Sequence, residues 1–226
     1  PVFFLLGMGI YSLYYQFFER QSAEALRGLA FFFGLLFIAE VVMIMIFGVD
    51  HRLVNAPYIG ESFTAIVTGM TFSIPYRLLA AFVIAGLMTL GISYYLNSSY
   101  FGRATSAVHQ DMMALSLMGA DPVMIKRIAF ALGLATCGLA GALMIIVIPI
   151  EPAVGRFFIG NVFAIVVLGG LGSIPGTLVG ALILGIAESL VSTFFGPSWA
   201  PAVSFGILLG VLAFKPTGLF GTGDTR

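Results

Sequence analysis

Long apolar runs separated by short polar stretches dominate this chain. Charged side chains are absent, or limited to one, in six runs: 1–18, 28–48, 78–96, 128–148, 157–187 and 189–214. A membrane-spanning helix needs about 20 mostly apolar residues, and most of these runs approach or exceed that length. The pattern predicts an all-α fold: a polytopic integral membrane helical bundle of about six to eight transmembrane or half-membrane segments.

Two of these runs contain internal breaks. The sequence GGLGSIPG, Gly169–Gly176, divides the first, and FGPSWAP, Phe195–Pro201, divides the second. Glycines let helices approach closely in membranes, and irregular backbone at membrane depth must be buried in protein or line a cavity. Close helix packing alone and a broken helix beside a permeation path both fit the first break. The candidates for the second interpretation are Gly169, Gly170, Gly172, Ser173 and Pro175.

One extended polar stretch, Gly102–Arg127, lies between two charge-free runs. Within it, 104–118 has helical spacing, with apolar residues recurring on one face. These are Val108, Met112, Leu115 and Met118. Gly119 stands where a helix-ending glycine belongs, and Asp121-Pro122 is typical of a helix start. We expect a short amphipathic helix, a turn, and a new helix entering the membrane; a helix that simply lies on the bilayer is the alternative.

An internal similarity relates two segments that are 100 residues apart. Ile59–Pro75 aligns without gaps to Ile159–Pro175, and both segments end in Ser-Ile-Pro. The similarity can arise by chance, because both segments are built from a few apolar residue types. It can also reflect a duplicated membrane element of the kind found in transporters. Both interpretations stay open at this point.

Composition agrees with the membrane pattern. The 226 residues are 60% hydrophobic and only 9% charged, against about 25% charged in soluble domains. The net charge is zero, so no general attraction to nucleic acid is expected. The single cysteine, Cys137, excludes a disulfide within the chain, and we expect neither a metal site nor a cofactor. We expect one membrane domain over 1–226 that lacks N-terminal residues, because the chain opens at Pro1 within an apolar run.

The positive-inside rule assigns sides to the loops. Three of the basic residues lie in Gly102–Arg127, which places that stretch in the cytoplasm. Alternation then places 19–27 in the cytoplasm and both 50–58 and 151–156 outside. A cytoplasmic Lys215 requires an odd number of crossings after residue 157.

Two carboxylates fall within or beside apolar runs, Glu40 and Glu188. Ionisable residues at membrane depth are costly and suggest function, although both could lie near water at helix ends. Glu40 is the stronger candidate because it lies near the middle of its run. They form no catalytic pair, and the Gly-Lys-Ser/Thr ending of a phosphate-binding loop is missing after Gly176.

Three ordered motifs resemble the branched-chain amino-acid permeases of ATP-binding-cassette importers. They are GRATSAVHQDMMALSLMG at 102–119, VVLGGLGSIPGTLVGALILGIAES at 166–189 and FKPTGLFG at 214–221. Permeases for urea and short amides share them. The chain departs from this pattern in lacking the usual further N-terminal apolar segment. His109, Met112 and Met113 are also less typical than a charged run.

The resemblance implies a transport subunit of a bacterial or archaeal plasma (inner) membrane that has no catalysis of its own. Its implied partners are cytoplasmic ATP-binding subunits, a second permease subunit (a copy or a similar sister chain), an extracytoplasmic substrate-binding protein, an amino-acid substrate and membrane lipid. The stretch 102–127 would be the ATPase-coupling loop, with polar contacts from Arg103 and Asp111 and with Leu115 and Met118 filling a pocket. The residues that the resemblance assigns to this loop are Arg103, Asp111, Ala114, Leu115, Met118, Gly119 and Asp121.

Two other classes compete with this interpretation. A membrane-embedded enzyme would need clustered polar residues at membrane depth. An ion-coupled secondary transporter would need more intramembrane ligands and no cytoplasmic docking helix.

Overall fold

The computed structural model describes residues 1–18, 25–50, 62–67, 70–170, 172–215 and 218–221. Within these residues, six helices are long and apolar enough to cross a membrane, and a seventh, α1, is apolar but shorter. The predicted helical membrane fold is confirmed. The loops expected at 19–27 and 50–58 and the end of the polar tail lie mostly outside the described residues.

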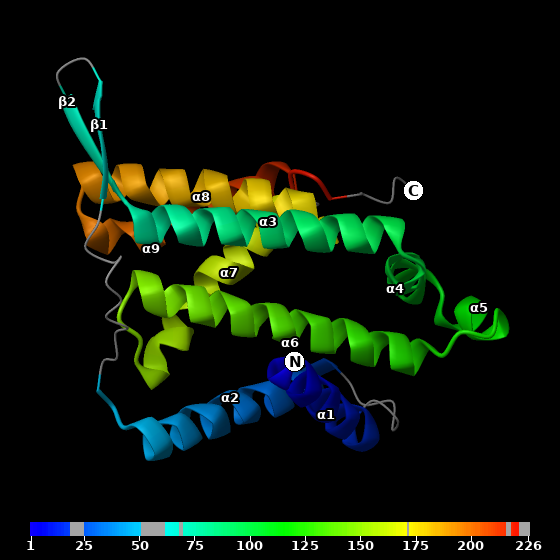
Figure 1. Cartoon of the computed structure of the whole chain (residues 1–226). Coiled ribbons are helices and arrows are strands. Elements are labelled where there is room, and N and C mark those ends of the chain that lie inside the picture. The colour runs from blue at the N-terminus through cyan, green and yellow to red at the C-terminus, as the bar shows by residue number, and fades with distance from the viewer. Residues whose placement is uncertain (19–24, 51–61, 68–69, 171, 216–217, 222–226) are drawn as a thin grey trace. The chain divides into compact units, whose positions relative to one another are not determined.

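The helix bounds follow the apolar runs closely (Figure 1). The helices are α1 (Val2–Phe17), α2 (Ala25–Phe47), α3 (Tyr76–Ser98), α4 (Tyr100–Gln110), α5 (Met112–Leu117), α6 (Pro122–Val147), α7 (Gly155–Gly169), α8 (Ile174–Phe194) and α9 (Ala200–Phe214). One-turn 3-10 helices, η3 (Pro152–Val154) and η4 (Pro197–Trp199), precede α7 and α9. The described chain forms two compact units, Pro1–Ala85 with Tyr94–Pro152, and Gly86–Ser93 with Ala153–Arg226. The prediction of a single domain stays a prediction.

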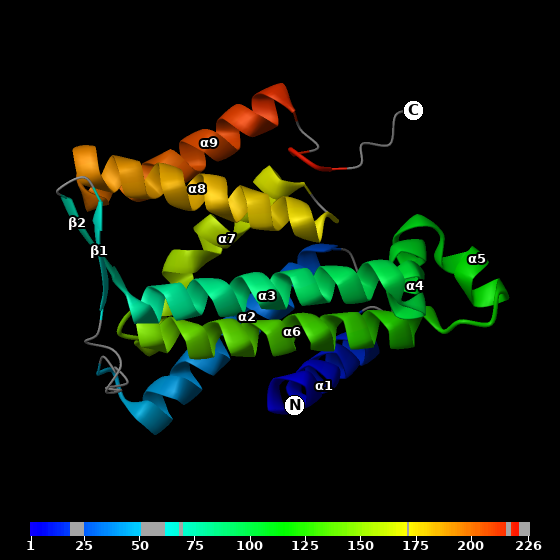
Figure 2. The ribbon, with the colours of Figure 1, turned by 45° about the horizontal axis from the view of Figure 1, so that its top comes forward.

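In the first unit, α1 packs along α6 (Figure 2). A Cβ on Gly7 would come within 2.7 Å of the Ala131 Cα, and Ala131 is fully buried. This is the close backbone approach that small residues permit between membrane helices. Aromatic rings hold α2 against this pair: the Phe32 ring lies 5.3 Å from that of Tyr14 on α1 and 5.8 Å from that of Phe130 on α6.

A two-stranded antiparallel hairpin precedes α3. Its strands are β1 (Ser62–Val67) and β2 (Met70–Pro75), with Ser62 paired to Pro75 and Val67 paired to Met70. The aligned segment Ile159–Pro175 instead forms the body of α7, a turn and the first residues of α8. The duplicated-element hypothesis is therefore wrong: a similar apolar pattern takes two different secondary structures.

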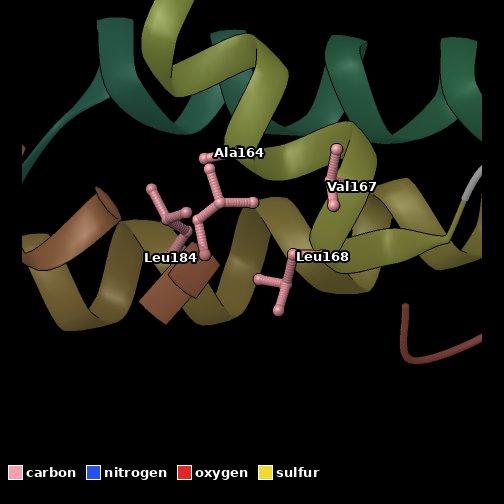
Figure 3. Packing of buried hydrophobic residues seen from close by; sticks show 5 residues of the cluster. Ala164, Val167, Leu168 and Leu184 are labelled. Carbon is pink, nitrogen blue, oxygen red and sulfur yellow. The ribbon is translucent and has the colours of Figure 1, made fainter. Parts of the chain in front are cut away.

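In the second unit, α7, α8 and α9 pack pairwise against one another. Their shared core consists of Ala164, Val167, Leu168, Leu184 and Leu208, and the first four of these are labelled in Figure 3. α8 continues beyond Ala187 to Phe194, so Glu188 lies within a helix, about two turns before its end. The three helices, with η3 and η4 included, have the length and composition to cross a membrane, which fits the odd number of crossings that a cytoplasmic Lys215 would require.

Candidate functional site

The polar stretch begins with a tight corner between α3 and α4. Ser99 caps α4, and its hydroxyl accepts a hydrogen bond from the Gly102 amide at 3.1 Å. A Cβ on Gly102 would overlap the carbonyl of Leu96, so α4 starts directly against the last turns of α3. Arg103 is exposed, and its Nη1 donates to the Ser98 carbonyl at 3.3 Å. The Arg103 guanidinium is thus tied to the corner and still reaches solvent.

The helix expected over 104–118 is interrupted at Asp111. Asp111 has extended backbone angles (φ −152°, ψ 106°), which end α4 and start α5. Its Oδ1 accepts hydrogen bonds from the Met113 amide at 2.8 Å and the Ala114 amide at 3.0 Å. The expectation of one continuous helix was wrong because the Asp111 carboxylate caps a new helix. This places Ala114 in the first turn of α5.

The predicted turn at Gly119 is confirmed. Gly119 has φ +83°, in the left-handed region that favours glycine. Its amide donates to the Ser116 carbonyl at 3.0 Å, and the Ala120 amide donates to the Leu115 carbonyl at 3.4 Å. This pair of bonds is the Schellman motif that satisfies the last carbonyls of a helix.

The start of the following helix is also as predicted. Asp121 caps α6 and accepts a hydrogen bond from the Val123 amide at 2.9 Å, with Pro122 in the first turn. Since α5 is capped at both ends and α6 begins at Pro122, three residues after Gly119, little backbone freedom separates the two helices.

Leu115 does not face a partner. It is only 6% exposed and packs with Ala104, Val108 and Ile125 inside the first unit. The prediction that Leu115 fills a pocket of another subunit was wrong, because α5 turns this side of itself toward α4 and α6. Met118, by contrast, is 82% exposed.

Three exposed apolar side chains instead form what we call the α5 tip: Met113, Leu117 and Met118. They are 76%, 83% and 82% exposed. Sequence reasoning missed Met113 and Leu117 as candidate contacts. The capping potential of Asp111 was the signal that could have identified them. A helix that starts at Asp111 turns Leu115 toward the buried side and leaves Met113 and Leu117 exposed. Figure 2 shows α4 and α5 together near the beginning of α6.

The Gly169–Gly176 segment joins two helices instead of breaking one. Gly170 and Gly172 have φ +99° and +88°, and the Ser173 hydroxyl caps α8 by accepting from the Gly176 amide at 3.1 Å. A Cβ on Gly169 would lie 2.5 Å from the Thr177 amide nitrogen. The interpretation of this segment as a break within one spanning helix is corrected, since the helical segments on either side, Pro152–Gly169 and Ile174–Phe194, both have spanning length. Pro175, in the first turn of α8, costs no helical hydrogen bond there.

The C-terminal motif binds the end of α7, a contact that sequence reasoning missed. The Leu219 amide donates to the Leu168 carbonyl at 2.9 Å, and the Phe220 amide donates to the Gly169 carbonyl at 3.2 Å. Lys215 Nζ donates to the Leu219 carbonyl at 2.8 Å. The carbonyls at a helix C-terminus lack partners within the helix, and here the chain after α9 supplies them. The glycines of the FKPTGLFG ending were the available signal, since a Cβ on Gly218 would lie 2.5 Å from the Gly170 Cα.

Glu188 lies in a polar cluster that links α7, α8 and α9. Its Oε1 accepts hydrogen bonds from Asn161 Nδ2 on α7, at 3.0 Å, and from the Ser204 hydroxyl on α9. Ser204 is completely buried. Sequence reasoning ranked Glu40 higher and named neither Asn161 nor Ser204, because only the fold brings these positions together. Glu40 is buried within α2.

Comparison with known proteins finds relatives that are named as permeases of branched-chain amino acid transport. The chain is 36% identical over 154 residues to the high-affinity branched-chain amino acid transport system permease protein BraD of Pseudomonas aeruginosa, covering 68% of this chain and 50% of that protein. It is 35% identical over 167 residues to the corresponding LivH protein of Escherichia coli, covering 74% and 52%. A probable LivH protein of the archaeon Methanocaldococcus jannaschii is 31% identical over 142 residues, covering 60% and 45%.

The chain thus spans about half the length of the curated relatives it matches. No solved structure matches it. Residues 7–212 match the family described as the permease component of the branched-chain amino acid transport system. That match covers both units, and it agrees with the multi-pass helical fold and with the motifs at 102–119 and 166–189. The chain belongs to the family of branched-chain amino acid transport permeases.

Proposed function

We propose that this chain is the transmembrane permease subunit of an ATP-driven importer that moves branched-chain amino acids across a bacterial or archaeal plasma membrane. Separate cytoplasmic subunits hydrolyse ATP, an extracytoplasmic protein delivers the substrate, and a second permease chain, identical or similar, completes the pathway. The family match and the names of the relatives support this assignment. Transport by alternating access then requires a mechanical link between ATP hydrolysis and the membrane helices.

The α5 tip is the observation that carries this proposal. Met113, Leu117 and Met118 are large apolar side chains exposed on a polar loop, where a helix that only borders water would carry polar ones. Exposed apolar groups that lie together mark interaction sites. Methionine adapts its shape to a partner's groove, so the tip suits a protein surface that changes shape with bound nucleotide.

The caps around the tip make it suitable for transmitting force. Asp111 fixes the start of α5 and the Schellman motif at Gly119 fixes its end. Leu115 anchors α5 against Ile125 on α6. A displacement of the tip therefore passes to α6, a helix of 26 residues with the length to cross the membrane.

A double substitution at the tip tests the proposal. Leu117→Ser with Met118→Ser removes two exposed apolar side chains without touching the buried Leu115. We expect the ATP-binding subunits to be lost on co-purification and uptake of radiolabelled leucine to fall at least about tenfold, the effect of losing about 1.4 kcal/mol of binding. A matched control, Gln110→Ser, changes an exposed polar residue on α4 and leaves both unchanged.

Two results would count against this function. If the doubly substituted permease keeps its ATP-binding subunits and transports normally, the α5 tip is not the coupling contact. If the unsubstituted transporter moves urea or a short amide but no branched-chain amino acid, the substrate class is different.

A further inference from the structure

A polar layer joins three helices of the second unit, with Ser204 fully buried and with Asn161 and Glu188 half-buried. Glu188 on α8 accepts hydrogen bonds at one carboxylate oxygen from Asn161 on α7 and Ser204 on α9. The helices α7, α8 and α9 therefore contribute one residue each, and the three meet at a single atom, Glu188 Oε1. The hydrogen bonds fix both the position and the orientation of the carboxylate.

The layer borders directly on the apolar core. The buried residues Ala164, Leu184 and Leu208 follow Asn161 by three positions, precede Glu188 by four and follow Ser204 by four. Residues three or four apart share one face of a helix, so each polar side chain lies one turn from a core side chain. A carboxylate in such surroundings in a membrane protein is expensive to maintain and indicates a function.

The position of the layer along α7 and α8 indicates which face of the membrane it lies closer to. Asn161 lies six residues after the start of α7 at Gly155, and Glu188 lies six residues before the end of α8 at Phe194. At 1.5 Å per residue, this is about 9 Å from the helix ends. With Gly102–Arg127 in the cytoplasm, alternation of sides places these ends on the extracytoplasmic face, where substrate arrives.

Two oxygen atoms in the layer, Glu188 Oε2 and Asn161 Oδ1, can still accept hydrogen bonds. The hydrogen bonds from Asn161 and Ser204 both end at Glu188 Oε1, and Asn161 presents its Nδ2 to the carboxylate. Among the residues that the structure describes, nothing donates to Glu188 Oε2 or to Asn161 Oδ1, and no lysine or arginine pairs with Glu188. A negative charge and a neighbouring amide oxygen therefore remain for a ligand that carries positive charge and several N–H donors.

We propose that Glu188 and Asn161 bind the ammonium group of the transported amino acid near the extracytoplasmic entrance, with Ser204 positioning the carboxylate. The proposal rests on the function proposed above and adds a selecting residue inside the membrane. An ammonium group supplies one positive charge and three donors, which match Glu188 Oε2 and Asn161 Oδ1. A neutral amide such as urea would supply donors without the charge and would gain less from this site.

The test uses the assembled transporter in lipid nanodiscs, first without the substrate-binding protein. Binding of radiolabelled leucine is challenged with leucinamide, which keeps the ammonium group, and with 4-methylpentanoate, which lacks it. We expect leucinamide to compete at least about tenfold better, because a hydrogen-bonded charge pair is lost with the second compound. Equal competition by the two compounds overturns the proposal without any substitution.

Variants then assign the effect to Glu188. Glu188→Gln keeps an oxygen that accepts from Asn161 and Ser204 but removes the charge, and we expect leucine transport from saturated binding protein to fall at least about tenfold. Ser189→Ala, at the exposed neighbour of Glu188 on α8, keeps the charge and is expected to stay within about threefold. Transport by Glu188→Gln at the unsubstituted rate overturns this inference alone, whereas an unsubstituted transporter that moves no branched-chain amino acid overturns the proposed function as well.

Discussion

The backbone at Gly119 decides how the chain leaves the α5 tip and enters α6. Its φ of +83° costs an ordinary L-residue about 1–2 kcal/mol, which corresponds to a factor of about 5–30 in the population of the turn. We expect the assembled transporter with Gly119→Leu to hydrolyse ATP while moving about 5–30 times less substrate per ATP. The reason is that the tip no longer holds its angle to α6. ATPase and uptake measurements on the same reconstituted sample give this ratio.

Space around Gly119 makes a sharp control possible. A Cβ there meets no atom within 4 Å, so bulk alone causes no clash within the described chain. Asparagine tolerates the left-handed conformation better than other side chains, and Gly119→Asn is expected to retain most coupling. A Gly119→Leu transporter as well coupled as Gly119→Asn would show that this backbone angle does not matter for transport.

Local signals at single residues predicted part of the candidate site. Gly119 and the Asp121-Pro122 pair act through backbone within a few residues of themselves, so their roles could be inferred from the sequence. The burial of Leu115 could not be inferred, because it depends on which face of α5 packs against Ile125. The cluster at Glu188 joins residues 27 and 16 positions away, and no local pattern relates such positions.

At the scale of elements, run length predicted the helices well because a membrane helix must satisfy its own backbone. The α8 helix shows where this reasoning failed. Glycines at 169 to 176 suggested a break within one span, but two spanning helices can also be joined by such a turn. The β1–β2 hairpin was missed for a related reason: its apolar pattern matches that of α7, and apolar runs this short do not distinguish strand from helix.

Contact between α7 and α8 depends on Gly176 lacking a side chain. A Cβ there would overlap the Gly169 carbonyl and lie 2.8 Å from Ser173 Oγ. Overpacking of this kind costs about 1–3 kcal/mol, so we expect Gly176→Ala to lower the thermal midpoint of the purified permease. Gly185, on the same helix, has no atom within 4 Å of a Cβ, and Gly185→Ala should be neutral or stabilising because alanine is the better helix former. Equal midpoints for both variants would show that the turn has room to relax.

At the scale of the whole chain, connectivity constrains the sides of the membrane. The bonds from Leu219 and Phe220 to α7 place the chain after α9 at the C-terminal end of α7. That geometry fits three spanning helices, so we expect α7, α8 and α9 to cross the membrane once each. If the basic stretch Gly102–Arg127 is cytoplasmic, as the positive-inside rule predicts, we expect Lys215 on the cytoplasmic side and η4 outside.

Cysteine accessibility tests this topology directly. In a Cys137→Ser background, single cysteines replace three exposed residues, Gln110 on α4, Ser198 in η4 and Lys215 after α9. A membrane-impermeant maleimide should label Ser198→Cys in right-side-out spheroplasts, and the other two only after the membrane is permeabilised. Ser198 and Lys215 are separated by α9 alone, so they form a matched pair for one crossing. Labelling of Lys215→Cys in sealed spheroplasts would mean that α9 does not cross or that the orientation is reversed. The label at Gln110→Cys distinguishes these two cases, because only a reversal exposes it as well.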